Sequence, residues 1–198
     1  MNKEVYASDG QYFLVKFSTH EKENYLNLLK NMHVIMDSSI VGTDALWNII
    51  ISEGEIHYSV YDSDWAYCGD LLVKRIKTAT PEIGIDLAEE HRNKGIAGKC
   101  IKLIARAIYA ERNDIDSFLL RVSSKNPHSK HMIEKLGAIF VGEEDSDVAK
   151  MLRTFCDSAL REGDMAFYEK YKKLLAELEE LDCEKILHYK LMPDSFIR

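Results

Sequence analysis

The sequence of 198 residues lacks the long apolar run, of about eighteen residues, that a transmembrane helix would require. Its first residues, MNKEVYASDGQYF, also lack the apolar core of a secretory signal, so we expect neither feature. Hydrophobic residues make up 46% of the chain, which is an ordinary share for a globular protein. Length and composition together predict a single domain, residues 1–198, with a sizeable core.

Cysteine is scarce, and basic residues are outnumbered by acidic ones. The cysteines Cys68, Cys100, Cys156 and Cys183 are too widely spaced for a metal or disulfide pattern, and two of them lie in apolar patterns typical of buried side chains. We therefore expect no metal site and a reducing, cytoplasmic compartment. The formal net charge of −7 argues against general binding to nucleic acid and is compatible with a cationic substrate. No membrane partner is expected.

The most informative segment runs from Glu82 to Ala110. A short apolar strand at residues 83–87 leads through a charged loop, residues 88–94, into the small-residue turn Gly95-Ile96-Ala97-Gly98. A helix follows, because apolar residues recur at close to the 3.6-residue helical period. These residues are Ile96, Cys100, Ile101, Leu103, Ile104, Ala107 and Ile108.

This strand–turn–helix unit has the features of an anion site. The first backbone N–H groups of a helix have no partner, and the helix dipole adds partial positive charge there. Small side chains let a phosphate group approach the backbone, and Arg92, Lys94 and Lys99 add full charges beside it. The unit therefore predicts a phosphorylated ligand at the end of the strand. The alternative is a turn without a ligand, with basic residues that are ordinary solvated surface charges.

Two known loop motifs can be compared with this turn. A nucleotide-binding P-loop needs a glycine at the position of Asn93 and a serine or threonine at that of Cys100, so this motif is excluded. The run Arg92-x-x-Gly95-x-Ala97 instead resembles the pyrophosphate loop, [QR]xxGx[GA], of the GNAT superfamily of N-acetyltransferases. In that family the loop holds acetyl-coenzyme A.

A second segment, further along the chain, carries the same resemblance. A strand at residues 117–122 precedes a turn at Asn126-Pro127, a short helix from Ser129 to Leu136 that ends at Gly137, and a strand at residues 138–142. The run from Asn126 to Gly137 resembles the GNAT signature NxxAxxLYEKxGF. Two signatures in the right order, each on the expected element, argue against a chance match.

The resemblance implies an α/β fold with a mixed, splayed sheet of about seven strands flanked by helices. It also implies that acetyl-coenzyme A, as co-substrate, binds in the notch after the fourth strand. The residues expected to bind it come from that strand, the loop and the second segment. They are Ile85, Asp86, Leu87, Arg92, Asn93, Lys94, Gly95, Ile96, Ala97, Gly98, Lys99, Asn126 and Ser129.

Acetyl transfer to an amine needs a base, because an alkylammonium with a pKa near 10 is only about one part in a thousand nucleophilic at neutral pH. Many GNAT proteins carry a glutamate ten or eleven residues before the first basic residue of the loop. Glu82 lies ten residues before Arg92 and is the predicted catalytic base. Asp86 and Glu55 are alternatives, and Glu82 could also be a solvated carboxylate at the end of a strand.

One residue departs from the family pattern. Many members use a tyrosine of the LYEKxGF segment to protonate the leaving thiolate, and Ile133 stands at that position here. Water, a nearby tyrosine or His131 would have to act instead, or the thiolate would leave unassisted. Two functions therefore stay open. One is an N-acetyltransferase for a primary amine, on a small molecule or a protein, which the sequence does not identify; the other is a non-catalytic acyl-coenzyme A binding or sensing module.

The other patterns complete the expected order of elements. They predict a strand at residues 11–17, a helix from a cap at Thr19 to about Met32, a second helix within residues 38–52, and strands at residues 55–61 and 67–75 joined by a turn.

Residues 143–182 are predicted to form a helical hairpin inserted before the last strand, residues 185–192. A first helix, capped at Ser146 or Asp147, would end at Gly163, and a second would begin at Asp164. A connection of this length is usually functional or part of an interface. We therefore expect its apolar faces to cap the parent domain, to close over the acceptor cleft as a lid, or to form a homodimer.

Overall fold

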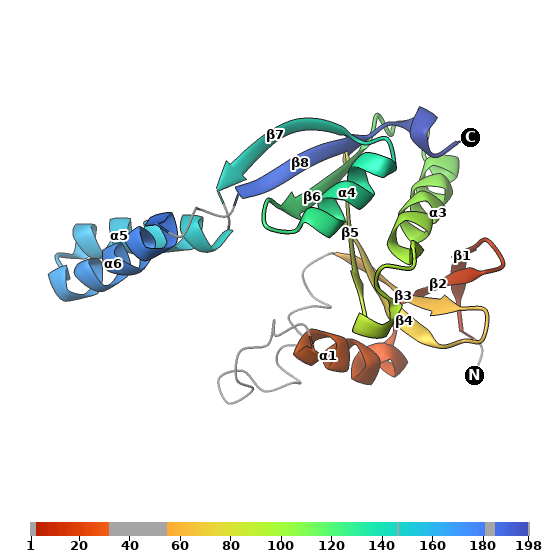
Figure 1. The fold of residues 1–198 in the computed structure, drawn as a ribbon, viewed down its shortest axis with the longest axis horizontal. Coiled ribbons are helices and arrows are strands. Elements are labelled where there is room, and N and C mark those ends of the chain that lie inside the picture. Colours follow the sequence, from red (N-terminus) through yellow and green to blue (C-terminus); the bar gives the residue numbers. More distant parts are fainter. Residues whose placement is uncertain (1–2, 32–54, 146, 181–184, 198) are drawn as a thin grey trace. The chain divides into compact units, whose positions relative to one another are not determined.

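The computed structural model describes residues 3–31, 55–145, 147–180 and 185–197. They form a mixed sheet of eight strands in the order β1-β2-β3-β4-β5-β6-β8-β7, with five α-helices described (Figure 1). The strands are β1 (Val5–Ser8), β2 (Tyr12–Lys16), β3 (Ile56–Asp62), β4 (Tyr67–Lys74), β5 (Glu82–Leu87), β6 (Phe118–Ser123), β7 (Ile139–Asp145) and β8 (Lys185–Leu191). The helices are α1 (Lys22–Asn31), α3 (Ile96–Glu111), α4 (Pro127–Lys135), α5 (Asp147–Glu162) and α6 (Met165–Glu180).

The chain divides into two compact units. The first unit comprises Met1–Leu120, Met132–Ile139 and Lys190–Arg198, and the second comprises Arg121–His131 and Phe140–Tyr189. The first unit therefore holds strands β1 to β5 with helices α1 and α3, and the second holds the helical pair α5 and α6.

In the first unit, strands β1 to β5 pair antiparallel, each with its neighbour along the chain. Alternate side chains of such strands point to opposite faces of the sheet. On one face the Tyr25 ring of α1 meets the His57 ring of β3, with centroids 5.5 Å apart. On the other face Lys99 of α3 lies over the Tyr12 ring of β2. Helices α1 and α3 therefore cover opposite faces of the sheet.

The apolar stripe of α3 is buried as its period predicts. Ile96, Cys100, Ile101, Ile104 and Ile108 are all at most 3% exposed, whereas Leu103 and Ala107 are only half-buried. Each large side chain buried in this way contributes about 1.5–3 kcal/mol relative to an exposed one. The α3 face of the sheet is thus the main apolar core of the first unit.

Most predicted elements are confirmed, with small shifts at their ends. The sheet has one strand more than expected, because β1 is a strand of four residues that the sequence pattern did not predict. The side chain of Ser18, not that of Thr19, accepts the capping bond, from the N–H of His20, and a 3-10 turn (Thr19–Glu21) precedes α1. The helix predicted within residues 38–52 lies outside the described residues.

In the second unit, α5 and α6 pack against each other as a helical hairpin. Gly163 ends α5 in the left-handed conformation, with φ 75°, and Oδ1 of Asp164 accepts a bond of 3.0 Å from the N–H of Phe167. The rings of Phe155 and Tyr171 hold the two helices together at a centroid distance of 5.2 Å. Strand β7 continues to Asp145, so the first residues of the predicted insertion are strand.

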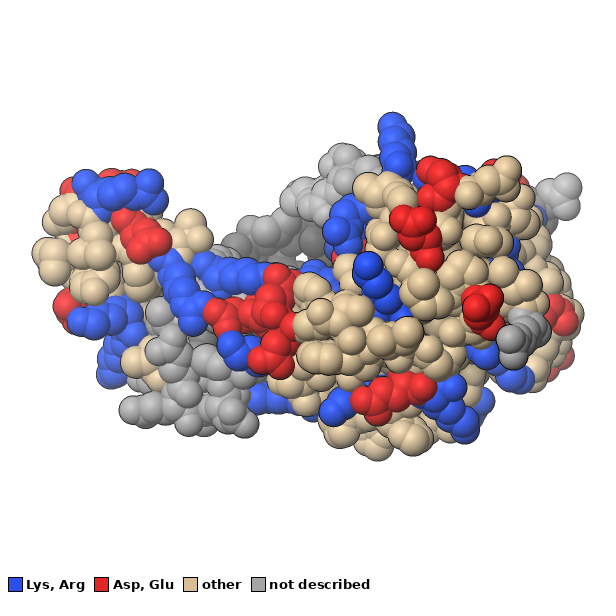
Figure 2. All heavy atoms as spheres, turned by 90° about the horizontal axis from the view of Figure 1, so that it is seen from above, with Lys and Arg blue, Asp and Glu red and all other residues tan. Residues whose placement is uncertain are grey.

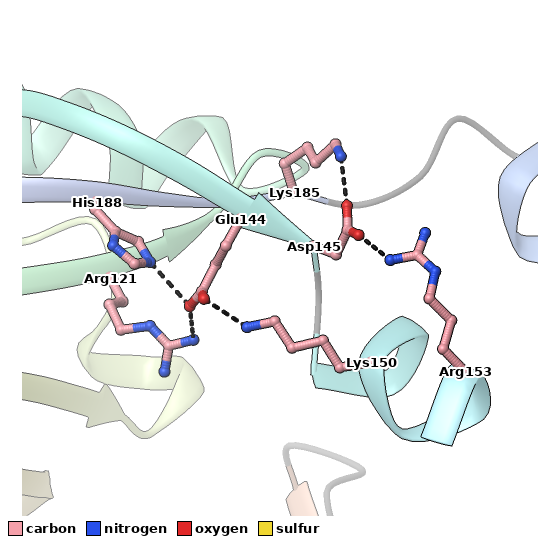
Figure 3. A network of polar contacts seen from close by, with 7 residues as sticks. All are labelled: Arg121, Glu144, Asp145, Lys150, Arg153, Lys185 and His188. Atoms are coloured by element: carbon pink, nitrogen blue, oxygen red, sulfur yellow. Dashed lines mark hydrogen bonds and ion pairs between the residues drawn. The ribbon is translucent and has the colours of Figure 1, made fainter. Parts of the chain in front are cut away.

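A network of charged side chains joins β6, β7, β8 and α5 within the second unit (Figure 3). Glu144 contacts Arg121, Lys150 and the imidazole of His188, and Asp145 contacts Arg153 and Lys185. The members are Arg121, Glu144, Asp145, Lys150, Arg153, Lys185 and His188. Single exposed ion pairs contribute at most about 1 kcal/mol, but a carboxylate shared by several cations is held more firmly. The network therefore fixes the end of β7 to the start of α5.

This network makes stability depend on acid pH. Hydrogen bonds from cationic groups, Lys150 foremost, lower the pKa of Glu144 to about 2, and those from Lys185 and Arg153 lower the pKa of Asp145 to about 2. A carboxyl group with a lowered pKa stabilises the fold above its unfolded pKa, and this contribution is lost as the pH falls through its folded pKa. We expect the free energy of unfolding to fall between about pH 4 and pH 2.

The double variant Glu144→Gln/Asp145→Asn should show a shallower fall over the same range, because up to two carboxyl groups no longer bind protons differently in the two states. Urea unfolding followed by circular dichroism at several pH values measures this slope. Glu143→Gln, at an exposed neighbouring position, is the control and should keep the wild-type slope. Equal slopes in the double variant and the wild type would show that the network contributes nothing.

Candidate active site

Strand β5 turns into α3 through two residues in the left-handed backbone conformation. After a 3-10 turn (Glu89–His91), Asn93 has φ 59° and Gly95 has φ 76°. Asparagine and glycine adopt this conformation at the least cost. The reversal places Gly95 at the N-cap of α3, directly after the end of β5.

The N-terminus of α3 is open to an anion. Glycine at the N-cap has no side chain to accept bonds from the first backbone N–H groups, and the first turn contains no acidic residue. The N–H of Lys99 is the first to bond within the helix, to the carbonyl of Gly95 at 3.3 Å. The N–H groups of Ile96, Ala97 and Gly98 precede it and have no intrahelical acceptor. Together with the helix dipole, they suit a phosphate group.

Glycine is required at Gly95 and at Gly98 for different physical reasons. A Cβ atom on Gly95 would meet nothing within 4 Å, so this residue is needed for its positive φ. A Cβ atom on Gly98 would lie 3.3 Å from Cδ2 of Leu136, so its small size serves packing against the residue that follows α4. Packing on Leu136 is thus a reason for Gly98 to be small that is independent of the predicted approach of a phosphate.

The three basic residues of the loop are held differently. Nε of Arg92 donates to the carbonyl oxygen of Leu87 at 2.9 Å, which braces the loop against the end of β5. Nζ of Lys99 donates to Oε1 of Gln11 at 2.6 Å. Lys94 is exposed. Arg92 and Lys99 thus have structural contacts within the protein, and all three cations still raise the potential near the N-terminus of α3.

Asn126 and Ser129 belong to the second unit, where they cap α4. Oδ1 of Asn126 accepts a bond of 3.0 Å from the N–H of Ser129, and Pro127 is the first helical residue. This is an N-cap followed by a proline, a typical helix start. The capping explains the Asn-Pro pair locally, and a role of either residue toward the cofactor stays a prediction. Ile133 of the same helix is buried, at 4% exposure.

The candidate bases have different surroundings. Glu82 forms an ion pair with Nη2 of Arg75 at 3.2 Å, and Glu55 forms one with Nζ of Lys74 at 2.7 Å. Asp86 is exposed and has no ion pair with a described residue, although Arg92 acts on it electrostatically. Partial desolvation by surrounding protein raises the pKa of Asp86, while the charges of Arg92 and His57 oppose this rise.

The structure also brings forward two residues that sequence reasoning missed, His57 on β3 and Asp70 on β4. Nδ1 of His57 lies 2.8 Å from Oδ2 of Asp70, and both side chains are buried. The sequence offered one signal for these two residues, which is that each is a polar residue in the middle of a largely apolar strand. Their partnership depends on the pairing register of two strands, which the sequence does not display.

Other kinds of site receive no support from the described part of the chain. No group of three His, Cys, Asp or Glu side chains there could hold a metal ion. The three described cysteines are buried and free, and burial raises the thiol pKa of Cys68 to about 11 and that of Cys100 to about 12. Those two thiols are therefore not nucleophiles near neutral pH. None of the described helices is long and apolar enough to span a bilayer.

The charges on the described surface are mixed. On the face shown in Figure 2, Lys and Arg side chains are interspersed with Asp and Glu, and the coloured residues form no broad basic area.

The fold and this strand–turn–helix unit are those of the GNAT class of proteins. The family model of the acetyltransferase (GNAT) domain matches residues 13–139, and the chain therefore belongs to this family. No curated protein sequence matches the chain.

Solved structures of a spermidine N-acetyltransferase, SpeG from Vibrio cholerae, resemble the whole chain. A chimera of this enzyme with hSSAT has a TM-score of 0.64 at 15% identity, covering 94% of this chain and 98% of its own. The form in complex with CoA and spermine has a TM-score of 0.61 at 14% identity, covering 96% and 100%. A dodecameric form has a TM-score of 0.63 at 15% identity, covering 96% and 98%. At this level of identity the likeness shows the fold.

Two variants of one residue test the loop. Gly95→Asn and Gly95→Asp place side chains of the same shape at φ 76°, and both residue types tolerate this conformation and cap helices. Only Asp adds a negative charge at the N-terminus of α3. We expect Gly95→Asp to bind acetyl-coenzyme A at least about tenfold more weakly than Gly95→Asn, which corresponds to about 1.4 kcal/mol. Titration calorimetry measures both affinities, and equal values would place the pyrophosphate elsewhere.

Proposed function

We propose that this protein transfers the acetyl group of acetyl-coenzyme A to a primary amine. The observation that carries the proposal is the uncapped N-terminus of α3 directly after β5, in a chain of the GNAT family. Backbone N–H groups at residues 96–98 can bind a pyrophosphate, and no carboxylate in the first turn repels it. The described residues of the loop therefore fit coenzyme A.

In this proposal residues 93–98 hold the pyrophosphate, and the backbone of residues 85–87 faces the reacting end of the molecule. Strand β5 pairs with β6 in parallel at Glu82 and Leu119, and this short pairing agrees with the splayed sheet of the family. Acetyl-coenzyme A would supply an acetyl group activated as a thioester. Asn126 and Ser129 stay predicted contacts of the same molecule.

In this proposal the protein removes a proton from the acceptor amine, and the leaving sulfur gains one. An alkylammonium must lose a proton before its nitrogen can attack, so a carboxylate near the reacting atoms is required. Glu82 is the base that the sequence predicts, and one of its oxygens is engaged by Arg75. Asp86 lies on the same strand, four residues or about 13 Å further toward the loop. Ile133 offers no proton donor, so a water molecule or another side chain would protonate the leaving sulfur.

The acceptor is proposed only as a class. The structural relatives are named as acetyltransferases of spermidine, and one of them was solved with spermine. The net charge of −7 suits a cationic amine of this kind, although acidic proteins are common. Polyamines are therefore the first acceptors to test, ahead of protein N-termini, lysines and amine-bearing antibiotics.

The second candidate function is a non-catalytic acyl-coenzyme A binding or sensing module. The observation that favours it is Ile133, which is buried where many family members carry a proton-donating tyrosine. Such a module would keep the loop between β5 and α3 and bind acetyl-coenzyme A without turnover.

Thiol release from acetyl-coenzyme A against a panel of amines separates the two functions. We expect release above the water background with at least one primary amine, and N-acetylated product of matching mass. Calorimetry on the same preparation reports whether acetyl-coenzyme A binds. Binding without release for every class of amine would favour the sensing module, and absence of binding would contradict both functions.

We also propose that a second copy of this chain is a partner, and that the two copies associate through the helical hairpin. Four apolar side chains of α5 and α6 are between 36% and 54% exposed: Phe155, Leu160, Met165 and Phe167. Apolar groups of this kind, gathered on one hairpin, are typical of a protein interface. A structural relative is named as dodecameric, which supports assembly by this chain as well. A homodimer would cover these side chains.

The double variant Leu160→Glu/Met165→Glu tests this assembly. Both side chains are about half exposed, so the charges should leave the hairpin folded but prevent an apolar contact between copies. We expect the variant to sediment as a smaller species than the wild type at equal concentration. Asp157→Ala, at an exposed polar position of α5, should keep the wild-type mass. A monomeric wild type, or an unchanged mass in the double variant, would exclude assembly through this surface.

A further inference from the structure

Three titratable side chains lie in a row across three neighbouring strands of the first unit. His57 stands on β3, Asp70 on β4 and Asp86 on β5, and these strands are adjacent in the sheet (Figure 1). Asp70 and Asp86 are direct partners in the antiparallel register of β4 and β5. Side chains of such partners share one face, with Cβ atoms about 4.5–5.5 Å apart. The row therefore consists of the imidazole of His57, the carboxyl group of Asp70 and the carboxyl group of Asp86, in that order.

The row leads from the interior to the surface. The His57 and Asp70 side chains are buried, at 5% and 4% exposure, and Nδ1 of His57 lies 2.8 Å from Oδ2 of Asp70. Asp86 at the other end is exposed. A substrate can therefore reach Asp86, while the other two residues act only through it.

The buried part of the row has polar atoms that folding alone does not explain. Nε2 of His57 and Oδ1 of Asp70 are buried and have no hydrogen-bond partner among the described residues. Ser59 Oγ and Tyr67 Oη, on the same two strands, are in the same state. Buried polar groups without partners are rare in native proteins and are retained where they serve water binding or catalysis.

The charge of Asp86 makes Asp70 more basic, and desolvation makes Asp86 itself more basic. Burial raises the pKa of Asp70 to about 6, the hydrogen bond and charge of His57 oppose the rise, and the charge of Asp86 adds to it. Two carboxylates that share a site bind a proton more readily than an isolated one, and they titrate as a pair. An ordinary exposed aspartate with a pKa near 3.9 would be a weak base at neutral pH. Desolvation raises the pKa of Asp86, Arg92 and His57 oppose this rise, and the negative charge of Asp70 at the paired position acts in the same direction as desolvation.

We propose that Asp86 takes the proton of the acceptor amine, and that Asp70, held by His57, makes Asp86 basic enough to do so. This inference rests on the proposed acetyl transfer. Asp86 is the catalytic residue, because it alone of the three can touch the substrate, and Asp70 and His57 are positioning residues. Glu82 and Glu55, the other carboxylates considered, are each engaged by a cation.

The proton balance is simple. The N–H bond of the ammonium breaks, its electron pair stays on nitrogen, and the proton forms an O–H bond on Asp86. The amine loses a second proton when its bond to the acetyl carbon forms, and this proton ends on the departing sulfur as a thiol. Asp86 then releases its proton to solvent through its exposed side.

Other charged and titratable groups face the row from the elements packed against it. Arg92 faces Asp86 from the loop and stays charged at all relevant pH values. Tyr67 on β4 stays neutral, because burial and the charge of Asp70 raise its pKa. Tyr25 of α1 contacts the ring of His57, and Glu21 acts on Tyr67 from the 3-10 turn before α1. A variant of Asp70 leaves these groups unchanged, so it isolates the coupling of the two carboxyl groups.

The test compares variants by kcat and kcat/KM for the best amine of the panel, between pH 5 and pH 9. Asp86→Asn should lower kcat by about 10²–10⁴ without changing the affinity for acetyl-coenzyme A. Asp70→Asn should lower kcat less and move the acid limb of the profile to lower pH, because the neighbouring charge is gone. Asp64→Asn, the same change at an exposed turn, is the matched control and should behave as wild type.

His57 is tested by a pair of variants. His57→Asn keeps an N–H donor near the place of Nδ1 and should retain most of the activity, whereas His57→Leu should resemble Asp70→Asn. If the buried variants do not fold, the exposed Asp86→Asn still decides the catalytic assignment. Wild-type kcat in Asp86→Asn, or loss of rate in Glu82→Gln instead, would overturn the proposal.

A measurement without any substrate tests the coupling by itself. Carboxyl carbon chemical shifts, followed by NMR against pH, give the titration of Asp86 in the wild type and in Asp70→Asn. We expect the Asp86 midpoint to fall in the variant, and an unchanged midpoint would refute the role of Asp70. If the wild type acetylates no amine, the proposed function fails, and this titration still reports whether the row is coupled.

Discussion

The reversal of the chain between β5 and α3 is the constraint on which the candidate site depends. Asn93 and Gly95 must both adopt positive φ values for the first turn of α3 to begin directly after the strand. Arg92 braces the reversal by donating to the carbonyl of Leu87, and Gly98 lets the new helix pack on Leu136. Because a glycine N-cap leaves the first amides of α3 uncapped, the geometry that closes the turn also leaves a helix N-terminus that suits an anion.

The sheet of the first unit has two faces with different chemistry. The face under α3 is apolar and supplies the stable core, with residues such as Leu14, Val60 and Leu71 fully buried. The face under α1 holds the buried pair His57–Asp70 and ends at the exposed Asp86. Burying these polar groups costs stability, and the apolar face compensates for it. The pairing of the strands fixes the positions of these polar side chains. A catalytic base must be positioned in this way before the substrate binds.

The second unit relies on charge where the first relies on apolar packing. Glu144 and Asp145 at the end of β7 gather cationic groups from β6, β8 and α5, while four described apolar side chains of the helical hairpin stay exposed. Firm anchoring at one end and an open apolar surface along the helices are what a contact with a second molecule requires. The family resemblance did not imply this element, because the corresponding connection in GNAT proteins is a modest loop.

The sequence by itself determined the order of the described elements, the family and the turn between β5 and α3, because these depend on local periodicity, on Gly95 and on motif spacing. It did not predict β1, whose four residues are too few to show a period, and it placed the first cap at Thr19 where Ser18 accepts the bond. Only the tertiary structure decided that Gly98 serves packing and that His57, Asp70 and Asp86 form a row. The physical reason is that strand register, which no local pattern encodes, brings residues far apart in the chain into direct opposition.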